Sequence, residues 1–133
     1  MRQILPALAS LACLSLVSCS LRESNPPAFN DEGKTVSALI KEWKCEGIDF
    51  EHDDELQDST LAIYFINSKS VPTLPYQDTT KQLYSVCLQI KHALAKPELY
   101  NRYHLTFQEL KGNKLFGTTG NVLSDEFLSR DLH

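Results

Sequence analysis

Two stripes of apolar residues along the chain predict two helices. The first stripe has the i, i+3, i+4, i+7 spacing that places side chains on one helical face. Its members are Val36, Leu39, Ile40 and Trp43. Asn30 or Asp31 is suited to cap the start of this helix, and Gly47 is suited to end it. The pattern therefore predicts a helix that packs through one face, between residues 31 and 47.

The second stripe is longer and predicts the main helix of the chain. Asp78 is a good N-cap for it. The helix should end near Lys96, because the residue before Pro97 avoids helical backbone angles. Its apolar face comprises Leu83, Val86, Cys87, Ile90, Ala93 and Leu94.

Shorter apolar runs predict strands. Residues 61–66 are continuously apolar and rich in β-forming side chains, which is typical of a central strand covered on both sides. Ahead of this run, Ile48 and Phe50 alternate with acidic residues, which favours a short edge strand.

Residues 102–118 predict a hairpin. Gly112-Asn113 is a two-residue turn signal, and it would place Leu110 opposite Leu115. Side chains then alternate between two faces of the hairpin. The predicted core face carries Tyr103, Leu105, Phe107 and Phe116, and the opposite face carries His104, Thr106 and Gln108. The tail "SDEFLSRDLH" predicts a short terminal helix capped by Ser124.

The order of these elements predicts an α+β fold. A helix, strand, helix, strand, strand sequence implies one parallel strand pair joined by a crossover helix. We expect a small two-layer α/β sandwich, with a three- to four-stranded mixed sheet and two main helices on one face. Residues 32–133 should form this single domain, since about 100 residues is an ordinary domain length.

The N-terminal pattern is of another kind. Ile4 to Val17 is almost wholly apolar or small, a run of about 14 residues that matches the core of a signal peptide and falls short of the roughly 20 needed to span a bilayer. The run ends in Leu16-Val17-Ser18-Cys19. This tetrapeptide resembles the lipobox of bacterial lipoproteins, in which a leucine and two small or modest residues precede an obligatory cysteine.

The resemblance implies cleavage between Ser18 and Cys19 and attachment of lipid to the Cys19 thiol. Residues 1–18 are then a signal peptide. Residues 19–31, which include Pro26-Pro27, form a polar tether that reaches roughly 30 Å at about 3.1 Å per residue. Because Ser20 follows the cysteine, the resemblance favours an outer-membrane anchor that faces the periplasm.

Charge and composition exclude one class of partner. The formal net charge is −4, and the chain has no basic stripe, so nucleic acid is not an expected partner. The residues also supply no phosphate-binding glycine loop, no zinc motif and no ordered catalytic motif, so we expect no cofactor.

Two cysteines remain beyond the signal and the lipid site. Cys45 and Cys87 are an even pair in an oxidising compartment, where a bridge between them would stabilise the fold by roughly 4 kcal/mol on the chain-entropy account. The alternative is two separate buried thiols that pack as small hydrophobic groups. The sequence leaves both open.

Two segments are candidates for ligand binding. Residues 46–59 hold seven acids and His52, but they lack the alternation and turn glycine of a calcium loop, so we predict no metal site there. The loop "SKSVPTLPYQ" follows a parallel strand and precedes a helix, where ligands tend to bind in α/β sheets. Tyr76 and Gln77 are its candidate contacts.

The function expected from the sequence is a membrane-anchored, non-enzymatic domain that binds a protein or another component of the cell envelope. Two alternatives stay open. One is a lipoprotein that binds a small molecule or a divalent cation. The other is a minor envelope hydrolase, since catalytic groups can assemble from distant residues and His52, Asp53 and His104 are available.

Overall fold

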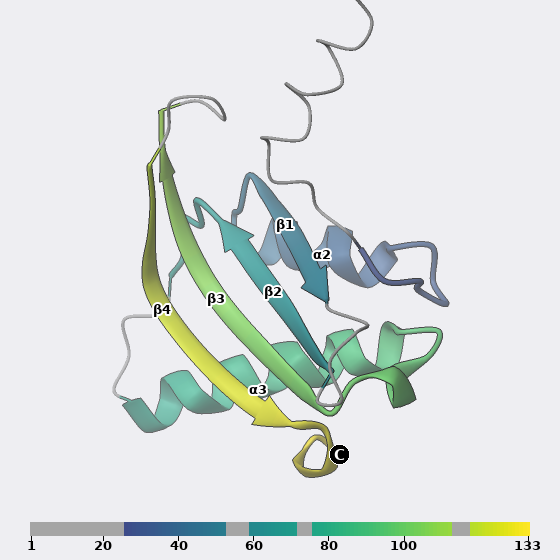
Figure 1. Cartoon of the computed structure of the whole chain (residues 1–133). Helices are drawn as coiled ribbons and strands as arrows, with labels where there is room; N and C mark the ends of the chain where they lie inside the picture. The colour runs from purple at the N-terminus through teal and green to yellow at the C-terminus, as the bar shows by residue number, and fades with distance from the viewer. Residues whose placement is uncertain (1–25, 53–58, 72–75, 113–117) are drawn as a thin grey trace, which may run out of the picture.

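The computed structural model describes residues 26–52, 59–71, 76–112 and 118–133. Within these ranges the chain folds into two layers, a four-stranded sheet and two helices that lie on one face of it (Figure 1). This confirms the predicted α+β fold class. The described residues contain no helix that is both long and apolar enough to cross a membrane.

The sheet has the strand order β1-β2-β3-β4. The strands are β1 (Gly47–His52), β2 (Thr60–Ile66), β3 (Arg102–Lys111) and β4 (Thr118–Leu128). The β1–β2 and β3–β4 pairs are antiparallel, whereas β2 and β3 are parallel and are joined through helix α3. The predicted edge strand, central strand and parallel crossover pair are therefore all present.

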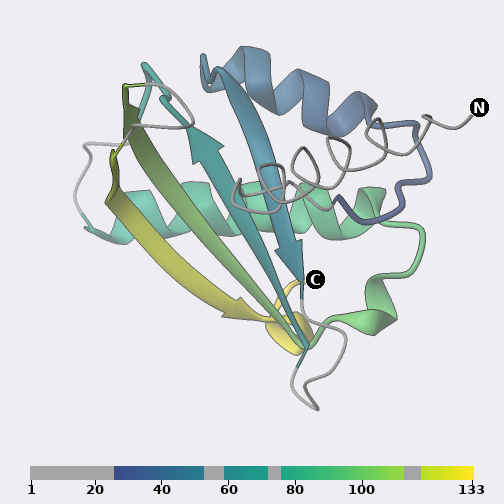
Figure 2. The same ribbon diagram turned by 45° about the horizontal axis from the view of Figure 1, so that its top comes forward.

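Helix α2 (Lys34–Glu42) covers β1, and helix α3 (Tyr76–Ala93) runs across the sheet beneath the other strands (Figures 1 and 2). Asp31 supports the start of α2, because its carboxylate accepts the backbone N–H groups of Gly33 and Thr35. The predicted end of α2 is wrong. The helix stops at Glu42, and Lys44 takes the left-handed conformation (φ 52°) that was assigned to Gly47.

Helix α3 begins three residues earlier than predicted from an N-cap at Asp78. It starts at Tyr76, so Asp78 lies in the first turn and is not the N-cap. The helix ends at Ala93, ahead of Pro97, and a short 3-10 helix η2 (Pro97–Leu99) leads into β3. All six members of the predicted apolar stripe are buried.

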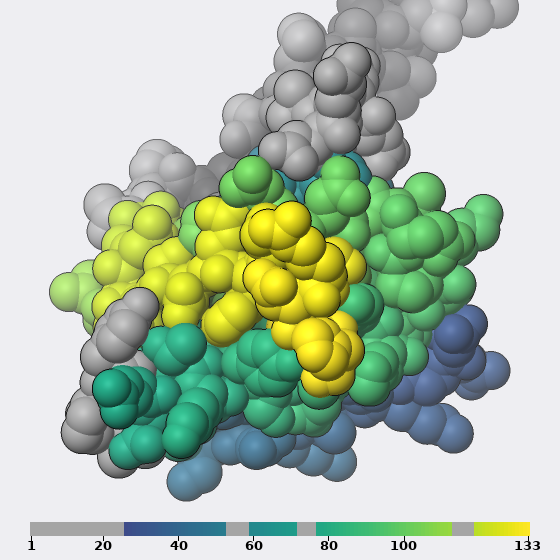
Figure 3. All heavy atoms as spheres, turned by 90° about the horizontal axis from the view of Figure 1, so that it is seen from below, coloured from purple at the N-terminus to yellow at the C-terminus, as the bar shows by residue number. Residues whose placement is uncertain are grey.

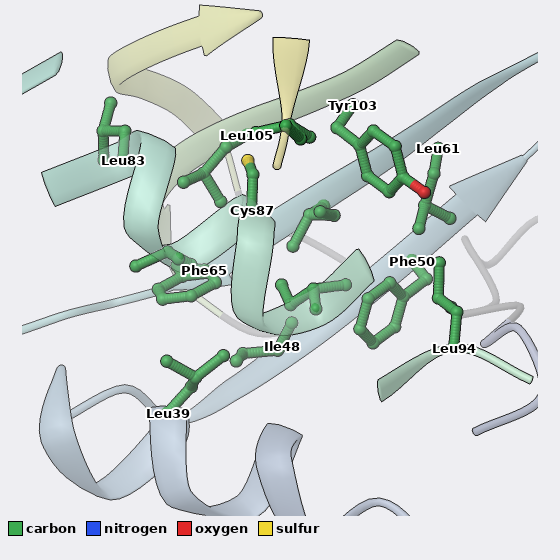
Figure 4. Close-up of a cluster of buried hydrophobic side chains, with 14 of the residues drawn as sticks. Leu39, Ile48, Phe50, Leu61, Phe65, Leu83, Cys87, Leu94, Tyr103 and Leu105 are labelled. Atoms are coloured by element: carbon green, nitrogen blue, oxygen red, sulfur yellow. The ribbon is translucent and has the colours of Figure 1, made fainter. Parts of the chain in front are cut away.

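The core lies between the sheet and the two helices (Figure 4). Alternate residues of the two central strands fill it: Leu61, Ile63, Phe65, Tyr103, Leu105 and Phe107, each at most 1% exposed. The β2 side chains between them are only half-buried, so the continuous apolar run is not covered equally on both sides. Trp43 closes one end of the core against Phe65 and Phe107, with ring centroids 6.3 and 5.5 Å apart.

The C-terminal third departs most from the sequence prediction. Leu110 pairs with Thr119 and Lys111 with Thr118, so the hairpin loop is longer than the predicted Gly112-Asn113 turn, and Leu115 and Phe116 lie outside the described residues. The tail is not a helix capped by Ser124. Residues up to Leu128 form β4, and only the 3-10 turn η3 (Ser129–Asp131) follows.

The first described residues form an arm that belongs to the domain. Phe29 makes a β-bridge with Leu94 and packs its ring on Phe50, at a centroid distance of 5.6 Å. On either side of the bridge, the N–H of Asn30 donates to Ala93 and the N–H of Ala95 donates to Ala28. The predicted boundary between tether and domain at residue 32 is therefore too late, since the chain is docked from Ala28 onward.

Candidate functional site

Helices α2 and α3 both pack on one face of the sheet, so neither of these two described helices covers the side chains on the opposite face (Figures 1 and 2). We call this surface the open face. Successive side chains of a strand point to opposite faces of the sheet, so every second residue of each strand lies on the open face. Its polar members are Asp49, Glu51, Tyr64, Arg102, His104, Thr106, Gln108, Asn121, Ser124 and Glu126.

The centre of the open face is a network between β3 and β4. Nε2 of His104 lies 2.6 Å from Oγ of Ser124, which is also 3.3 Å from Oγ1 of Thr106. One row further along, Nε2 of Gln108 donates to Oδ1 of Asn121 at 3.2 Å. Thr106 and Gln108 are 3% and 8% exposed, and such buried polar groups are tolerated because they are hydrogen-bonded.

Charged groups flank this hydrogen-bonded centre. Arg102 donates from Nη1 to Oε1 of Glu126 at 3.3 Å, and the hydroxyl of Tyr64 donates to Oε2 of Glu51 at 3.3 Å. The open face therefore has a hydrogen-bonding centre with ionic groups at its margins. Apolar side chains that lie on the same face are Ala62, Ile66 and Leu128. This mainly polar composition suits a polar partner.

The His104–Ser124 contact is the arrangement closest to a catalytic one. A histidine bonded to a serine hydroxyl can act as a general base for that nucleophile, provided an acid orients the ring and donors stabilise the oxyanion. The acid in register with His104 is Glu126, but its carboxylate is bonded to Arg102. Within the described residues the pair therefore has two of the three members of a triad, on a sheet surface.

The two edges of the sheet are both guarded against pairing with another strand. On β1, Asp49 and Glu51 place negative charge along a short edge. On β4, Asp125 lies on the helix-facing side opposite Leu105, and Val122 is the extra residue of a bulge between the Phe107 and Gln108 pairs. Acidic edges, inward-facing charges and bulges all oppose edge-to-edge association. The faces, more than the edges, are therefore available for binding.

Of the two alternatives that the sequence leaves open for Cys45 and Cys87, the structure has two separate free thiols and no bridge between them. Cys45 follows α2 and lies at the β1 side, whereas Cys87 on α3 lies under the far half of the sheet, close to Asp125 of β4 (Figure 4). Neighbouring strands are about 4.8 Å apart, so these places are separated by more than the roughly 7 Å that a bridge allows between Cα atoms.

Burial alters the acid–base chemistry of the core without creating a reactive group. Burial raises the pKa of the Cys87 thiol to about 12, and the charge of Asp125 adds to the effect. Burial also raises the pKa of Tyr103 to about 12 and that of Cys45 above its usual value. A raised thiol pKa lowers the thiolate fraction, so neither cysteine is a nucleophile at neutral pH.

The predicted binding segments are only partly within the described residues. Tyr76 and Gln77 form the first turn of α3, and Gln77 is exposed; residues 72–75 lie outside the description, as do Ser18, Cys19 and residues 53–58 of the acidic stretch. In the part of the chain that is described, no three histidine, cysteine or acidic side chains form a cluster able to hold a metal ion.

Sequence reasoning placed His104, Thr106 and Gln108 on one face, which the structure confirms. Their partners Asn121, Ser124 and Glu126 are not predicted, because the sequence pattern indicates a loop and a terminal helix where the structure has β4. The available signal was the β-forming run Thr118, Thr119, Val122 and Leu123.

Comparison with known proteins gives no match, whether against protein families, curated proteins or solved structures.

Proposed function

We propose that this protein is a lipoprotein of the bacterial cell envelope, anchored through Cys19, whose domain binds an envelope component and is not an enzyme. The observation that carries the proposal is Leu16-Val17-Ser18-Cys19 at the end of a short apolar run. A cysteine with two or three acyl chains would hold the protein to the membrane almost permanently, because each buried methylene contributes about 0.8 kcal/mol.

The open face is the surface that we assign to binding. It is mainly polar, neither α2 nor α3 covers it, and side chains at its centre are held in place by hydrogen bonds across β3 and β4. Pre-positioned polar groups lose little conformational entropy when a partner replaces water on them. Because both edge strands oppose pairing with another strand, a partner is expected to bind on the open face and not as an added strand. A protein surface or an envelope polymer rich in hydrogen-bonding groups fits this chemistry.

The anchor is tested by mass spectrometry of the mature N-terminal peptide. The expected product begins at Cys19 and carries the mass of a diacylglyceryl group, with or without an amide-linked acyl chain. The matched variants are Cys19→Ala, which should lose lipid and membrane association, and Cys13→Ala, which should keep both. A mature protein with an unmodified Cys19 overturns the proposal.

Binding is tested by cross-linking and capture from intact envelopes. The test variant is His104→Ala/Ser124→Ala, which removes the bonded pair at the centre of the open face. The control is Ser85→Ala/Gln89→Ala, which removes a similar exposed pair from α3. We expect one reproducible partner, whose capture falls at least about tenfold in the test variant, the loss of one or two central contacts, and is unchanged in the control.

A hydrolase is the rival function, and the 2.6 Å contact between His104 and Ser124 is the observation that favours it. Two single variants, Ser124→Ala and Ser85→Ala, separate the proposals. If wild-type protein hydrolyses small activated esters with turnover, and Ser124→Ala abolishes this while Ser85→Ala does not, the protein is an enzyme. Equal background rates in all three proteins favour the binding domain.

A further inference from the structure

Hydrogen bonds between connecting segments define two opposite ends of the sandwich. At one end the arm is bonded to the last turn of α3, Asn101 donates to Ser59, and Ser129 donates to Asn101. We call this the arm end. It gathers the C-terminus of α3, η2 and the starts of β2 and β3.

The opposite end, which we call the tip end, is held by a different set of contacts. Asn67 accepts the N–H of Leu110 at 2.7 Å and donates to the carboxylate of Glu46 at 2.9 Å. Lys69 donates its backbone N–H to Lys44 at 3.1 Å. This end therefore carries the C-terminus of α2, the residues after β2, the end of β3 and the start of β4. Figures 1 and 2 both show the end of β3 and the start of β4 on the opposite side of the molecule from the end of α3.

The docked arm shortens the connection between lipid and domain. The predicted tether ran to Asn30 and Asp31, but the carbonyl of Ala28 is already bonded to the N–H of Ala95 at 2.9 Å. Only the residues from Cys19 to Ala28 are left to span the gap. The nine Cα–Cα steps from Cys19 to Ala28 can extend over at most about 31 Å.

We infer that the arm end of the domain faces the lipid headgroups and that the tip end is turned away from the membrane. The inference rests on the proposed lipidation of Cys19. Ala28, which is hydrogen-bonded to Ala95, stays within about 31 Å of the bilayer, because this is the greatest length of the connection from Cys19 to Ala28. Lys111 at the tip is separated from Arg102 by the ten residues of β3, about 30 Å. The connection from Cys19 to Ala28 is no longer than about the length of β3, so the tip end can reach the headgroups only when this connection is almost fully extended.

Surface chemistry at the arm end is compatible with a headgroup layer. The exposed residues around the end of α3 include His92 and Lys96, and Leu99 of η2 is 52% exposed. Glu98 lies between the last two, so the surface is mixed in charge and does not require anionic lipid. The partner is therefore the polar surface of a bilayer in general, at close range but without insertion.

The test is energy transfer from the domain to acceptor-labelled headgroups in vesicles that hold the mature lipidated protein. Single donor dyes are attached at Ala95→Cys or at Lys111→Cys, both exposed positions, in a Cys45→Ser background. We expect transfer from position 95 to be at least about twice that from position 111, given the roughly 30 Å length of β3. Equal transfer from the two positions overturns the inference.

A matched variant with a longer tether between Cys19 and Ala28 serves as the control. Insertion of a glycine- and serine-rich segment between Asn25 and Pro26 should lower transfer from position 95 and reduce the difference between the positions, because a longer flexible chain lets the domain turn over. Failure of the lipidation proposal gives a different result. An unmodified Cys19 by mass spectrometry, with no transfer from either position, removes the anchor and the orientation together.

Discussion

The ammonium group of Lys91 on α3 donates to the carbonyl oxygen of Leu132 at 2.8 Å. It also donates to Ser129 at 2.7 Å, and the Tyr84 hydroxyl is bonded to the backbone of Asp131 and His133. These contacts hold the last five residues against α3, where Figure 3 shows the C-terminal residues in yellow lying on the teal helix. Leu132 is 1% exposed as a result.

Replacement of Leu132 by alanine should therefore destabilise the whole domain. Truncation of a buried leucine costs about 2–5 kcal/mol, and loss of the charged hydrogen bonds in Lys91→Met should cost about 1.5–3 kcal/mol. Urea denaturation followed by circular dichroism measures both changes. The exposed neighbour variant Arg130→Ala should shift stability by less than about 0.5 kcal/mol. Equal stability of the Leu132 variant and the wild type would contradict the packing described here.

Removal of the Phe29 ring should release the arm without unfolding the domain. The ring is half-buried on Phe50, so we expect Phe29→Ala to cost about 1–3 kcal/mol, less than a fully buried phenylalanine. Hydrogen exchange of the Asn30 and Ala95 amides should accelerate selectively. The Asn30 amide donates from the arm to Ala93, and the Ala95 amide donates to Ala28 of the arm, so both bonds are lost when the arm is released. The exposed control Ala28→Ser should leave both rates unchanged.

The two cysteines of the mature domain should react with a thiol reagent at very different rates. Cys45 is half-buried and should react slowly in the native protein, whereas Cys87 is buried and should react only as fast as the protein unfolds. Titration in urea without a reductant should count two thiols per chain. A count of zero would show a bridge between Cys45 and Cys87 and would contradict the structure.

Stability should fall in alkaline solution. The native state keeps the protons of Cys87 and Tyr103 up to a pKa of about 12 for each, while the unfolded chain releases them near 9.0 and 10.0. A native pKa above the unfolded one stabilises the fold fully below the unfolded pKa, and this contribution is lost as pH rises through the native value. The urea midpoint should therefore decrease from about pH 9 upward. A Cys87→Ala/Tyr103→Phe variant should show a shallower decrease.

Local patterns were sufficient to predict the elements that bury one complete apolar face. Leu39 of α2, Cys87 of α3 and Phe107 of β3 were each assigned to the correct face from spacing alone, because burial of a stripe is what makes those segments fold as they do. The parallel pair followed from element order. The helix ends were less predictable, since Lys44 adopts positive φ where a glycine was expected.

The predictions that failed depend on contacts between distant parts of the chain. Strand β4 has Asp125 on its core side, which breaks the alternation of Leu123 and Phe127 and hides the strand. The arm is docked by backbone bonds to Ala93 and Ala95, which leave no trace in the side-chain pattern around Phe29. The open face depends on the same strand, so half of its network was not predicted.

The parallel register of the two central strands, in which Thr60 is paired with Arg102, also has a kinetic consequence. All of α3 and η2 must be synthesised before this pair can close, and closure of so long a segment is slow compared with a hairpin. The earlier strands meanwhile have only one antiparallel neighbour, which gives little stability alone. A nascent chain built in this order therefore cannot complete its central sheet until β3 has been synthesised.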